Sequence, residues 1–216
     1  MSAHRLAASG EVEVRIPVDS ITLEGMLARP REGRGLVIFA HGSGSSRFSP
    51  RNNFVARVLR EAGLGSLLFD LLTVGEDTHY EKRFDIGLLA QRLMGATRWA
   101  AAQLGPTVKI GYFGASTGAA AALWAAAELG SVSAVVSRGG RPDLAEPFLP
   151  RVKAPTLLIV GEYDPVVLDL NRAAYERIRA EKQLVVVPGA THLFEEPGAL
   201  ERVAQLARDW FLKYLC

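Results

Sequence analysis

The stretch that decides the fold is IGYFGASTGAAAALW, residues 110–124. Its apolar first part leads into Gly114-Ala115-Ser116-Thr117-Gly118, and small apolar residues follow without a proline. This pattern predicts a buried strand over residues 108–113, a sharp turn, and a helix over residues 117–129. The flanking glycines leave room for the serine to take a strained backbone conformation, with its hydroxyl exposed beside a helix N-terminus.

Strands and helices alternate along the chain on both sides of this turn. Residues 12–16 and 21–28 are expected to form an antiparallel hairpin. Further strands are expected over residues 36–40, 66–69, 108–113, 134–137, 156–160 and 184–187. Helices are expected over residues 51–62, 85–103, 117–129, 169–181 and 198–214. This order predicts an α/β protein, a three-layer α/β/α sandwich whose mostly parallel central sheet has about seven or eight strands and an antiparallel N-terminal edge.

Length and composition indicate one globular domain. The chain has 216 residues, of which 49% are apolar and 22% are charged, as is usual for soluble proteins of one domain. We expect a single domain over residues 1–216, with residues 1–10 as a loose N-terminal extension. Residues 139–153, which contain three prolines, are expected to form an irregular excursion that is too short for a large cap domain.

Charge and cysteine content narrow the choice of partners. The 25 basic and 23 acidic residues leave a net charge of +2, without the Lys and Arg block that follows a phosphate backbone. The N-terminus lacks the apolar core of a signal peptide, and the uncharged residues 110–127 suit a strand and helix better than a membrane span. We therefore expect a cytoplasmic monomer or homodimer that acts on a small molecule, with neither nucleic acid nor membrane as a partner. The only cysteine, Cys216, allows no intrachain disulfide.

One histidine lies where a serine nucleophile would need a base. A serine hydroxyl is a weak nucleophile near neutral pH and requires an imidazole or similar base within hydrogen-bond reach. Of the four histidines, His192 follows the strand over residues 184–187, and loops after parallel strands meet at one edge of the sheet. His41 also follows a strand, but it precedes Ser116 and begins a glycine-rich loop, which it is expected to brace. We predict Ser116 as nucleophile and His192 as general base.

A carboxylate is expected to orient the imidazole and to stabilise its positive charge. Asp164 lies directly after the strand over residues 156–160, in Gly161-Glu162-Tyr163-Asp164. Glu162 is an alternative, and Asp169 is expected to cap the helix that follows. We choose Asp164, because the resulting chain order of serine, aspartate and histidine is the one expected with a G-x-S-x-G turn.

Four segments, in this order, resemble those of the α/β-hydrolases: His41-Gly42-Ser43-Gly44, Gly114-Ala115-Ser116-Thr117-Gly118, Gly161-Glu162-Tyr163-Asp164 and Thr191-His192. From about Ile21 onward the chain is similar to the dienelactone hydrolase-like branch, which is small and has short excursions. The resemblance implies the α/β-hydrolase fold and an oxyanion hole formed by the backbone N–H groups of Ser43 and Thr117. Dienelactone hydrolases proper carry a cysteine where this chain has Ser116, which disfavours a dienelactone substrate.

Other polar residues give weaker signals. Arg138 and Arg141 follow a strand and are candidates for binding an anionic substrate group, with salt bridges to Asp143 or Glu146 as the alternative. Asp70 is expected to hydrogen-bond neighbouring loop amides. No cluster of cysteine and histidine has metal-ligand spacing, and no nucleotide-binding glycine motif is present. We therefore expect neither a metal nor a cofactor.

These observations predict a serine hydrolase that cleaves a small ester, thioester or lactone through a covalent acyl-enzyme. An amide or peptide hydrolase would use the same triad, and a non-catalytic binding module would keep the fold and use its pocket for a ligand. Dehalogenases and epoxide hydrolases that resemble this chain carry an aspartate where it has Ser116, which disfavours both. Labelling by a fluorophosphonate that disappears in Ser116→Ala would separate an enzyme from a binding module.

Overall fold

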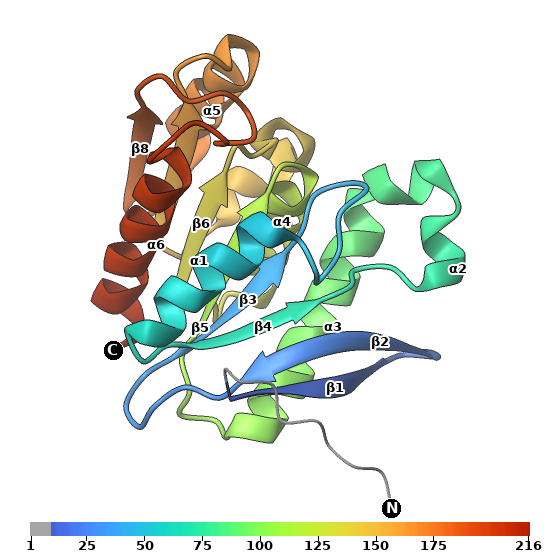
Figure 1. Ribbon diagram of the computed structural model, residues 1–216. Helices are drawn as coiled ribbons and strands as arrows, with labels where there is room; N and C mark the ends of the chain where they lie inside the picture. The colour runs from blue at the N-terminus through green and yellow to red at the C-terminus, as the bar shows by residue number, and fades with distance from the viewer. Residues whose placement is uncertain (1–9) are drawn as a thin grey trace, which may run out of the picture.

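A central eight-stranded sheet organises the molecule, in a computed structural model that describes residues 10–216 (Figure 1). The strands are β1 (Glu11–Val18), β2 (Ile21–Ala28), β3 (Leu36–Ala40), β4 (Gly65–Phe69), β5 (Ile110–Ala115), β6 (Ala134–Arg138), β7 (Thr156–Gly161) and β8 (Lys182–Val187). Their spatial order is β1-β2-β4-β3-β5-β6-β7-β8. The pairs β1–β2 and β2–β4 are antiparallel, and all five other pairs are parallel.

Helices cover both faces of this sheet. They are α1 (Pro50–Glu61), α2 (Val74–Asp77), α3 (Ile86–Leu104), α4 (Thr117–Leu129), α5 (Pro165–Arg177) and α6 (Ala199–Leu215), with the 3-10 helices η1 (Tyr80–Phe84) and η2 (Pro142–Arg151). One face carries α1 and α6, and the other carries α3, α4, α5 and η2 (Figure 1). The predicted three-layer α/β/α sandwich with an antiparallel N-terminal edge is thereby confirmed. The extension expected over residues 1–10 lies outside the described residues, apart from Gly10.

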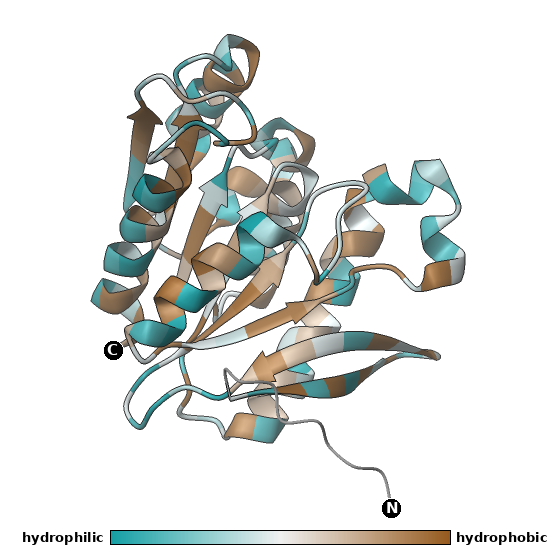
Figure 2. Ribbon diagram, viewed as in Figure 1, coloured by the Kyte–Doolittle hydropathy of each residue, from teal (hydrophilic) through white to brown (hydrophobic). Residues whose placement is uncertain are grey.

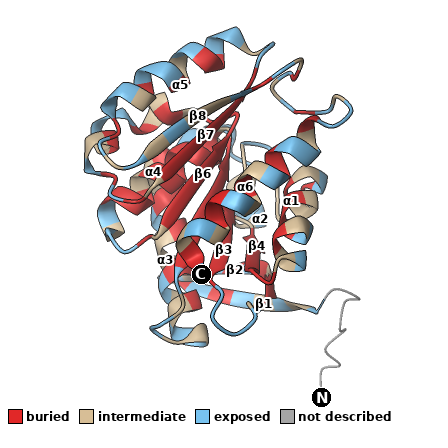
Figure 3. Cartoon of the chain, turned by 90° about the vertical axis from the view of Figure 1, so that its left-hand side faces the viewer, coloured by how far each residue is buried: buried red, intermediate tan, exposed pale blue. Residues whose placement is uncertain are grey.

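The strands from β3 to β7 are largely apolar because both of their faces are buried. Successive side chains of a strand point to opposite faces. In β3, Leu36 and Ile38 join the core under α3 and α4, whereas Val37 and Phe39 join the core under α1 and α6. Figure 2 shows much of the central sheet in brown and β1 in mixed colours, and Figure 3 shows the central strands as buried. The continuous hydrophobic runs in the sequence follow from this double burial.

Helix α4 is buried almost all round, unlike its neighbours (Figure 3). Its row of alanines lets the backbone lie close to the sheet on one side and to η2 on the other. The ring of Trp124 stacks on Phe148 of η2, with centroids 4.0 Å apart. The segment expected to be an irregular excursion is therefore mostly a packed, kinked 3-10 helix that covers α4.

Two local expectations were wrong. Helix α5 begins at Pro165 rather than at residue 169, because proline suits the first helical position and Asp164 precedes it as N-cap residue. Asp169 therefore lies inside the helix and does not cap it. The short elements α2 and η1 were not predicted, and Thr73 forms a capping box with Glu76 at the start of α2. Within residues 10–216, no helix combines the length and apolarity needed to cross a bilayer.

Candidate active site

Ser116 occupies a strained turn between β5 and α4. Its backbone has φ 52° and ψ −122°, a conformation that ordinary residues rarely adopt outside functional sites. The turn closes tightly because its glycines have no side chain. A Cβ atom at Gly118 would lie 2.1 Å from the carbonyl oxygen of Ala40, and one at Gly114 would lie 2.4 Å from the Cα of Ala119. The G-x-S-x-G spacing thus has a steric cause in this structure.

His192 and Asp164 lie together beyond the ends of β8 and β7. The Nδ1 atom of His192 is 2.6 Å from Oδ2 of Asp164, whose side chain is only 15% exposed. Asp164 holds the N-cap position of α5, yet its side chain makes no capping hydrogen bond. An aspartate at this position ordinarily accepts a bond from the first turn of the helix. Here its carboxylate is directed to the imidazole instead.

Glu162 and Asp169, the other carboxylates near Asp164 in the sequence, have other partners. Glu162 accepts a hydrogen bond from the backbone N–H of Gly189, at 2.7 Å. Asp169 pairs with Arg172 on the exposed side of α5, at 3.0 Å. The structure therefore brings Asp164, and neither alternative, to His192.

A cavity of about 230 Å³ contains both Ser116 and His192. Its lining comes from the loop after β3, the first turn of α1, the turn after β5, the end of β6 and the loop after β8, and comprises Gly42, Ser43, Ser45, Ser49, Arg51, Asn52, Ala115, Ser116, Arg138, His192 and Leu193. Among residues 10–216, no hydrogen bond joins the Ser116 hydroxyl to the imidazole. Catalytic hydrogen bonds are often long in free enzymes and tighten once substrate binds.

The glycine loop after β3 lies directly against the serine turn. The backbone N–H of Ser43 donates to the Thr117 hydroxyl, at 3.0 Å. Thr117 is the first residue of α4, so its own backbone N–H has no acceptor within the helix. Of the two backbone donors expected for an oxyanion hole, the Thr117 N–H has no acceptor among residues 10–216, and the Ser43 N–H donates to the Thr117 side chain.

His41 braces the same loop. Its Nδ1 lies 2.9 Å from the carbonyl oxygen of Gly42, and its Nε2 accepts the backbone N–H of Leu71 at 3.1 Å. These contacts require a neutral ring that is protonated on Nδ1. Burial lowers the pKa of His41 below its ordinary value, against smaller opposing effects of Gly42 and Asp70. The ring thus ties the loop after β3 to the loop after β4.

Arg138, at the end of β6, is buried and lacks a carboxylate partner. It is 8% exposed, and its Nε and Nη1 atoms have no hydrogen-bond partner among the described residues. Burial, together with the nearby charge of Arg51, lowers the pKa of Arg138 to about 10. Within residues 10–216, Arg138 does not form the salt bridge that the sequence analysis gave as the alternative to anion binding. Such a salt bridge is present for Arg141, whose guanidinium contacts Asp143 at 2.7 Å.

Arg51 was not recognised from the sequence as part of the site. It lies in the first turn of α1 and lines the same cavity as Arg138. The sequence does not distinguish this arginine from others in amphipathic helices, because only the folded chain places it in the lining of the Ser116 cavity. Asp70, by contrast, has the expected structural role, since it accepts the backbone N–H of Arg47 at 2.7 Å and pairs with the same guanidinium.

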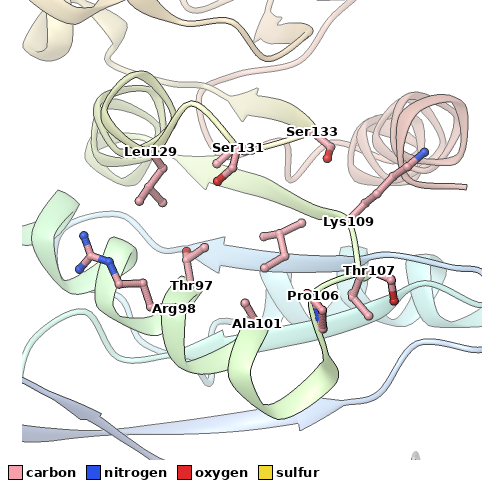
Figure 4. A pocket seen from close by; sticks show the side chains of 12 residues that line it. Thr97, Arg98, Ala101, Pro106, Thr107, Lys109, Leu129, Ser131 and Ser133 are labelled. Atoms are coloured by element: carbon pink, nitrogen blue, oxygen red, sulfur yellow. The ribbon is translucent and has the colours of Figure 1, made fainter.

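A second hollow lies at the opposite edge of the sheet, between α3 and the loop that follows α4 (Figure 4). It has a volume of about 310 Å³, and its polar lining includes Thr97, Arg98, Lys109, Ser131 and Ser133. It contains no pairing of a nucleophile with a base. Ligands of open parallel sheets bind at the carboxyl ends of the strands, and the Ser116 cavity lies at that edge.

Within residues 10–216, no three His, Cys, Asp or Glu side chains lie close enough together to hold a metal ion.

The doubly covered parallel sheet and the strained serine after β5 define the α/β-hydrolase class. The chain belongs to the Dienelactone hydrolase family, whose profile matches residues 23–214. A solved dienelactone hydrolase from Anabaena variabilis is 56% identical, with a TM-score of 0.91, and the match covers 95% of this chain and 98% of that one.

Two more distant structures share the fold. Est1E from Butyrivibrio proteoclasticus is 19% identical, with a TM-score of 0.79 over 93% of this chain and 98% of that one. An alpha-beta serine hydrolase homologue from Coxiella burnetii is 22% identical, with a TM-score of 0.77 over 91% of this chain and 95% of that one.

A longer relative has a different kind of name. A Mycobacterium tuberculosis protein that is named provisionally as a phosphoribosyl transferase is 57% identical over 206 residues, which are 94% of this chain and 46% of that protein. The chain therefore spans about half the length of the curated relatives it matches.

Proposed function

We propose that the chain is a serine esterase, which cleaves a small ester, thioester or lactone through a covalent acyl-enzyme at Ser116. The observation that carries the proposal is the diversion of the Asp164 carboxylate from the α5 N-terminus to Nδ1 of His192. A carboxylate in that position fixes the tautomer of the imidazole and leaves Nε2 free to accept a proton. The same ring lines the cavity that holds the strained serine.

In the first half of the reaction, His192 takes the proton of Ser116 while the serine oxygen attacks the acyl carbon. The imidazolium then gives this proton to the leaving alcohol, thiol or lactone oxygen as the bond between that atom and the acyl carbon breaks. In the second half, His192 takes a proton from water as the water oxygen attacks the acyl carbon. The bond between that carbon and Ser116 Oγ then breaks, the imidazolium returns its proton to the serine oxygen, and the acid is released. Asp164 stabilises the imidazolium in both halves without becoming protonated itself.

The oxyanion of each tetrahedral intermediate needs hydrogen-bond donors that are already in place. We assign the backbone N–H groups of Thr117 and Ser43 to this role. Thr117 has a free N–H at the positive end of α4. Ser43 contributes once its N–H turns from the Thr117 hydroxyl, 3.0 Å away, toward the substrate oxygen.

Amide hydrolysis with the same triad, and a binding module without activity, are the alternatives. The name of the M. tuberculosis relatives does not decide between them, because the chain covers 46% of those proteins and the name does not say which part holds the transferase. The cytoplasmic location, the monomeric or dimeric state and the single-domain organisation also stay predictions.

Steady-state kinetics on a series of p-nitrophenyl esters with acyl chains of increasing length test the proposal. Ser116→Ala and His192→Ala should each lower kcat by several orders of magnitude, about 10⁴- to 10⁶-fold, and the double variant should be no worse than the single ones. Additive losses would mean that the two residues do not act together. Turnover that survives in Ser116→Ala would overturn the assignment.

A further inference from the structure

The guanidinium of Arg138 lies in the wall of the Ser116 cavity and is not used by the hydrolytic mechanism. Its Nε and Nη1 atoms are buried without a hydrogen-bond partner in the described part of the chain. The ring of Phe194 lies 5.9 Å from the guanidinium carbon, which is near the limit at which a cation and an aromatic ring attract each other. A buried charge without a counter-ion costs several kcal/mol. This unfavourable free energy would be offset by an anionic ligand that binds to the Arg138 guanidinium.

A second guanidinium faces the same cavity. The Nε of Arg51 is also buried without a partner, while its Nη1 contacts the exposed carboxylate of Glu195 at 2.9 Å. The charge of Arg51 contributes to the lowered pKa of Arg138, so the two cations lie close enough to repel each other. Two neighbouring cations repel each other and destabilise the folded protein, and an anion between them removes this repulsion.

The lining of the cavity adds positive potential and holds no carboxylate of its own. Ser49 caps the N-terminus of α1 and lines the cavity, and the N-terminus of α4 begins at Ser116. Both helix ends carry partial positive charge. None of the lining residues is an aspartate or a glutamate.

We propose that Arg138 and Arg51 form an anion subsite beside Ser116, and that this subsite binds a phosphate group carried by the substrate. The inference rests on the proposed esterase function and names its substrate class, a small ester that bears a phosphate. A phosphate monoester carries close to two negative charges at neutral pH, and its three terminal oxygens can accept from two guanidinium groups at once. A carboxylate has one charge and two oxygens, so it offers fewer acceptors to the unpartnered Nε and Nη1 atoms of Arg138 and the Nε of Arg51.

The phosphate group anchors the substrate and takes no part in the reaction. The bond that breaks is still the one between the acyl carbon and its leaving atom, and the bond that forms is the one to Ser116 Oγ. The phosphate binds to Arg138 and fixes the position of the acyl carbon above the serine. Binding energy from a remote group of this kind orients the reacting atoms.

Three p-nitrophenyl esters with acyl groups of equal length, ending in a phosphate, a carboxylate or a methyl group, test the proposal. The wild-type protein should show the highest kcat/KM for the phosphate ester and the lowest for the methyl ester. Arg138→Gln should reduce kcat/KM for the phosphate ester at least about 30-fold more than for the methyl ester, because the phosphate loses a desolvated charge partner. Arg141→Gln is the matched control, and it should keep the wild-type order because the Arg141 guanidinium is occupied by Asp143.

A binding measurement separates this proposal from the esterase proposal and from misfolding. Calorimetric titration of Ser116→Ala with inorganic phosphate should show one site, and Arg138→Gln or Arg51→Gln in the same background should weaken its binding. Failure of phosphate to bind, an equal loss for all three esters in Arg138→Gln, or a preference for the carboxylate ester would overturn the phosphate subsite. Loss of all ester turnover together with intact phosphate binding would instead contradict the esterase function and leave the subsite standing.

Discussion

At the scale of single residues, the structure assigns roles through the partners that each side chain has or lacks. Asp164 stands at a helix N-cap, where an aspartate is expected for stability alone, but its carboxylate contacts His192. Arg138 and Arg141 are three positions apart, and only Arg141 has a carboxylate. The sequence could not separate these cases, because hydrogen-bond partners depend on where distant loops meet.

The unpaired charge of Arg138 predicts an effect on stability. We expect Arg138→Met to raise the free energy of unfolding at neutral pH by about 1–3 kcal/mol, since an apolar side chain of similar length removes a buried charge without a counter-ion. Urea denaturation checks this value. Arg141→Met removes only a partly exposed ion pair and should change stability by less than about 1 kcal/mol. A destabilised Arg138→Met would show that the guanidinium is compensated in the folded state.

His41 predicts a dependence of stability on pH. Burial lowers the pKa of His41 in the folded protein, while in the unfolded chain an imidazole binds a proton below a pH of about 6.5. Acidification through this range therefore favours the unfolded state, and the stability present at higher pH is lost. The free energy of unfolding of the wild-type protein should fall more between pH 7 and pH 5 than that of His41→Gln.

His79 provides the control for that measurement. It is exposed and lies 3.8 Å from Glu81, so His79→Gln should follow the wild-type curve. If His41→Gln and the wild-type protein lose the same free energy on acidification, His41 does not have the neutral bracing role described above.

At the scale of elements, the sequence predicted the regular parts of the fold and missed the short ones. The ranges of β3 and α4 agree with the structure residue for residue, because apolar runs and glycine boundaries mark them clearly. Helix α5 was placed four residues too late, since Pro165 was not recognised as its first residue. The pair α2 and η1 has no buried residues, so it left no hydrophobic pattern to detect.

The contact between the loop after β3 and the serine turn predicts the effect of a single methyl group. A Cβ atom at Gly42 would lie 3.1 Å from the Ser116 Cβ and 3.2 Å from the Ala115 carbonyl oxygen. Gly42→Ala should therefore shift the oxyanion donors by a few tenths of an ångström and lower kcat by about tenfold to a hundredfold. Ester hydrolysis measures kcat, and Gly75→Ala, a site with no heavy atom within 4 Å of its Cβ, should leave it unchanged. An unaltered kcat in Gly42→Ala would remove this loop from the proposed oxyanion hole.

At the scale of the whole molecule, the parallel sheet explains why residues so distant in sequence meet. The ends of β5, β7 and β8 lie at one edge, and they carry Ser116, Asp164 and His192 respectively. The chain order and the strand pattern were sufficient to predict this convergence. The meeting of Arg51 with Arg138 was not predictable, because it depends on how α1 approaches the end of β6.

The two cores share the sheet between them, which predicts a single cooperative unfolding unit. Each strand from β3 to β7 contributes side chains to both faces, so neither layer of helices can unpack alone without exposing the sheet. Calorimetry should give one transition whose calorimetric and van't Hoff enthalpies agree. Two separate transitions would contradict the single-domain organisation proposed for this chain.

Labelling with a fluorophosphonate, followed by mass spectrometry of the peptides, tests most directly whether Ser116, His192 and Asp164 form one catalytic unit. We expect a single adduct on Ser116 of the native protein, no adduct in Ser116→Ala, and strongly slowed labelling in His192→Ala and Asp164→Ala. Native protein that stays unlabelled, or that is labelled at the same rate without His192, would contradict this expectation.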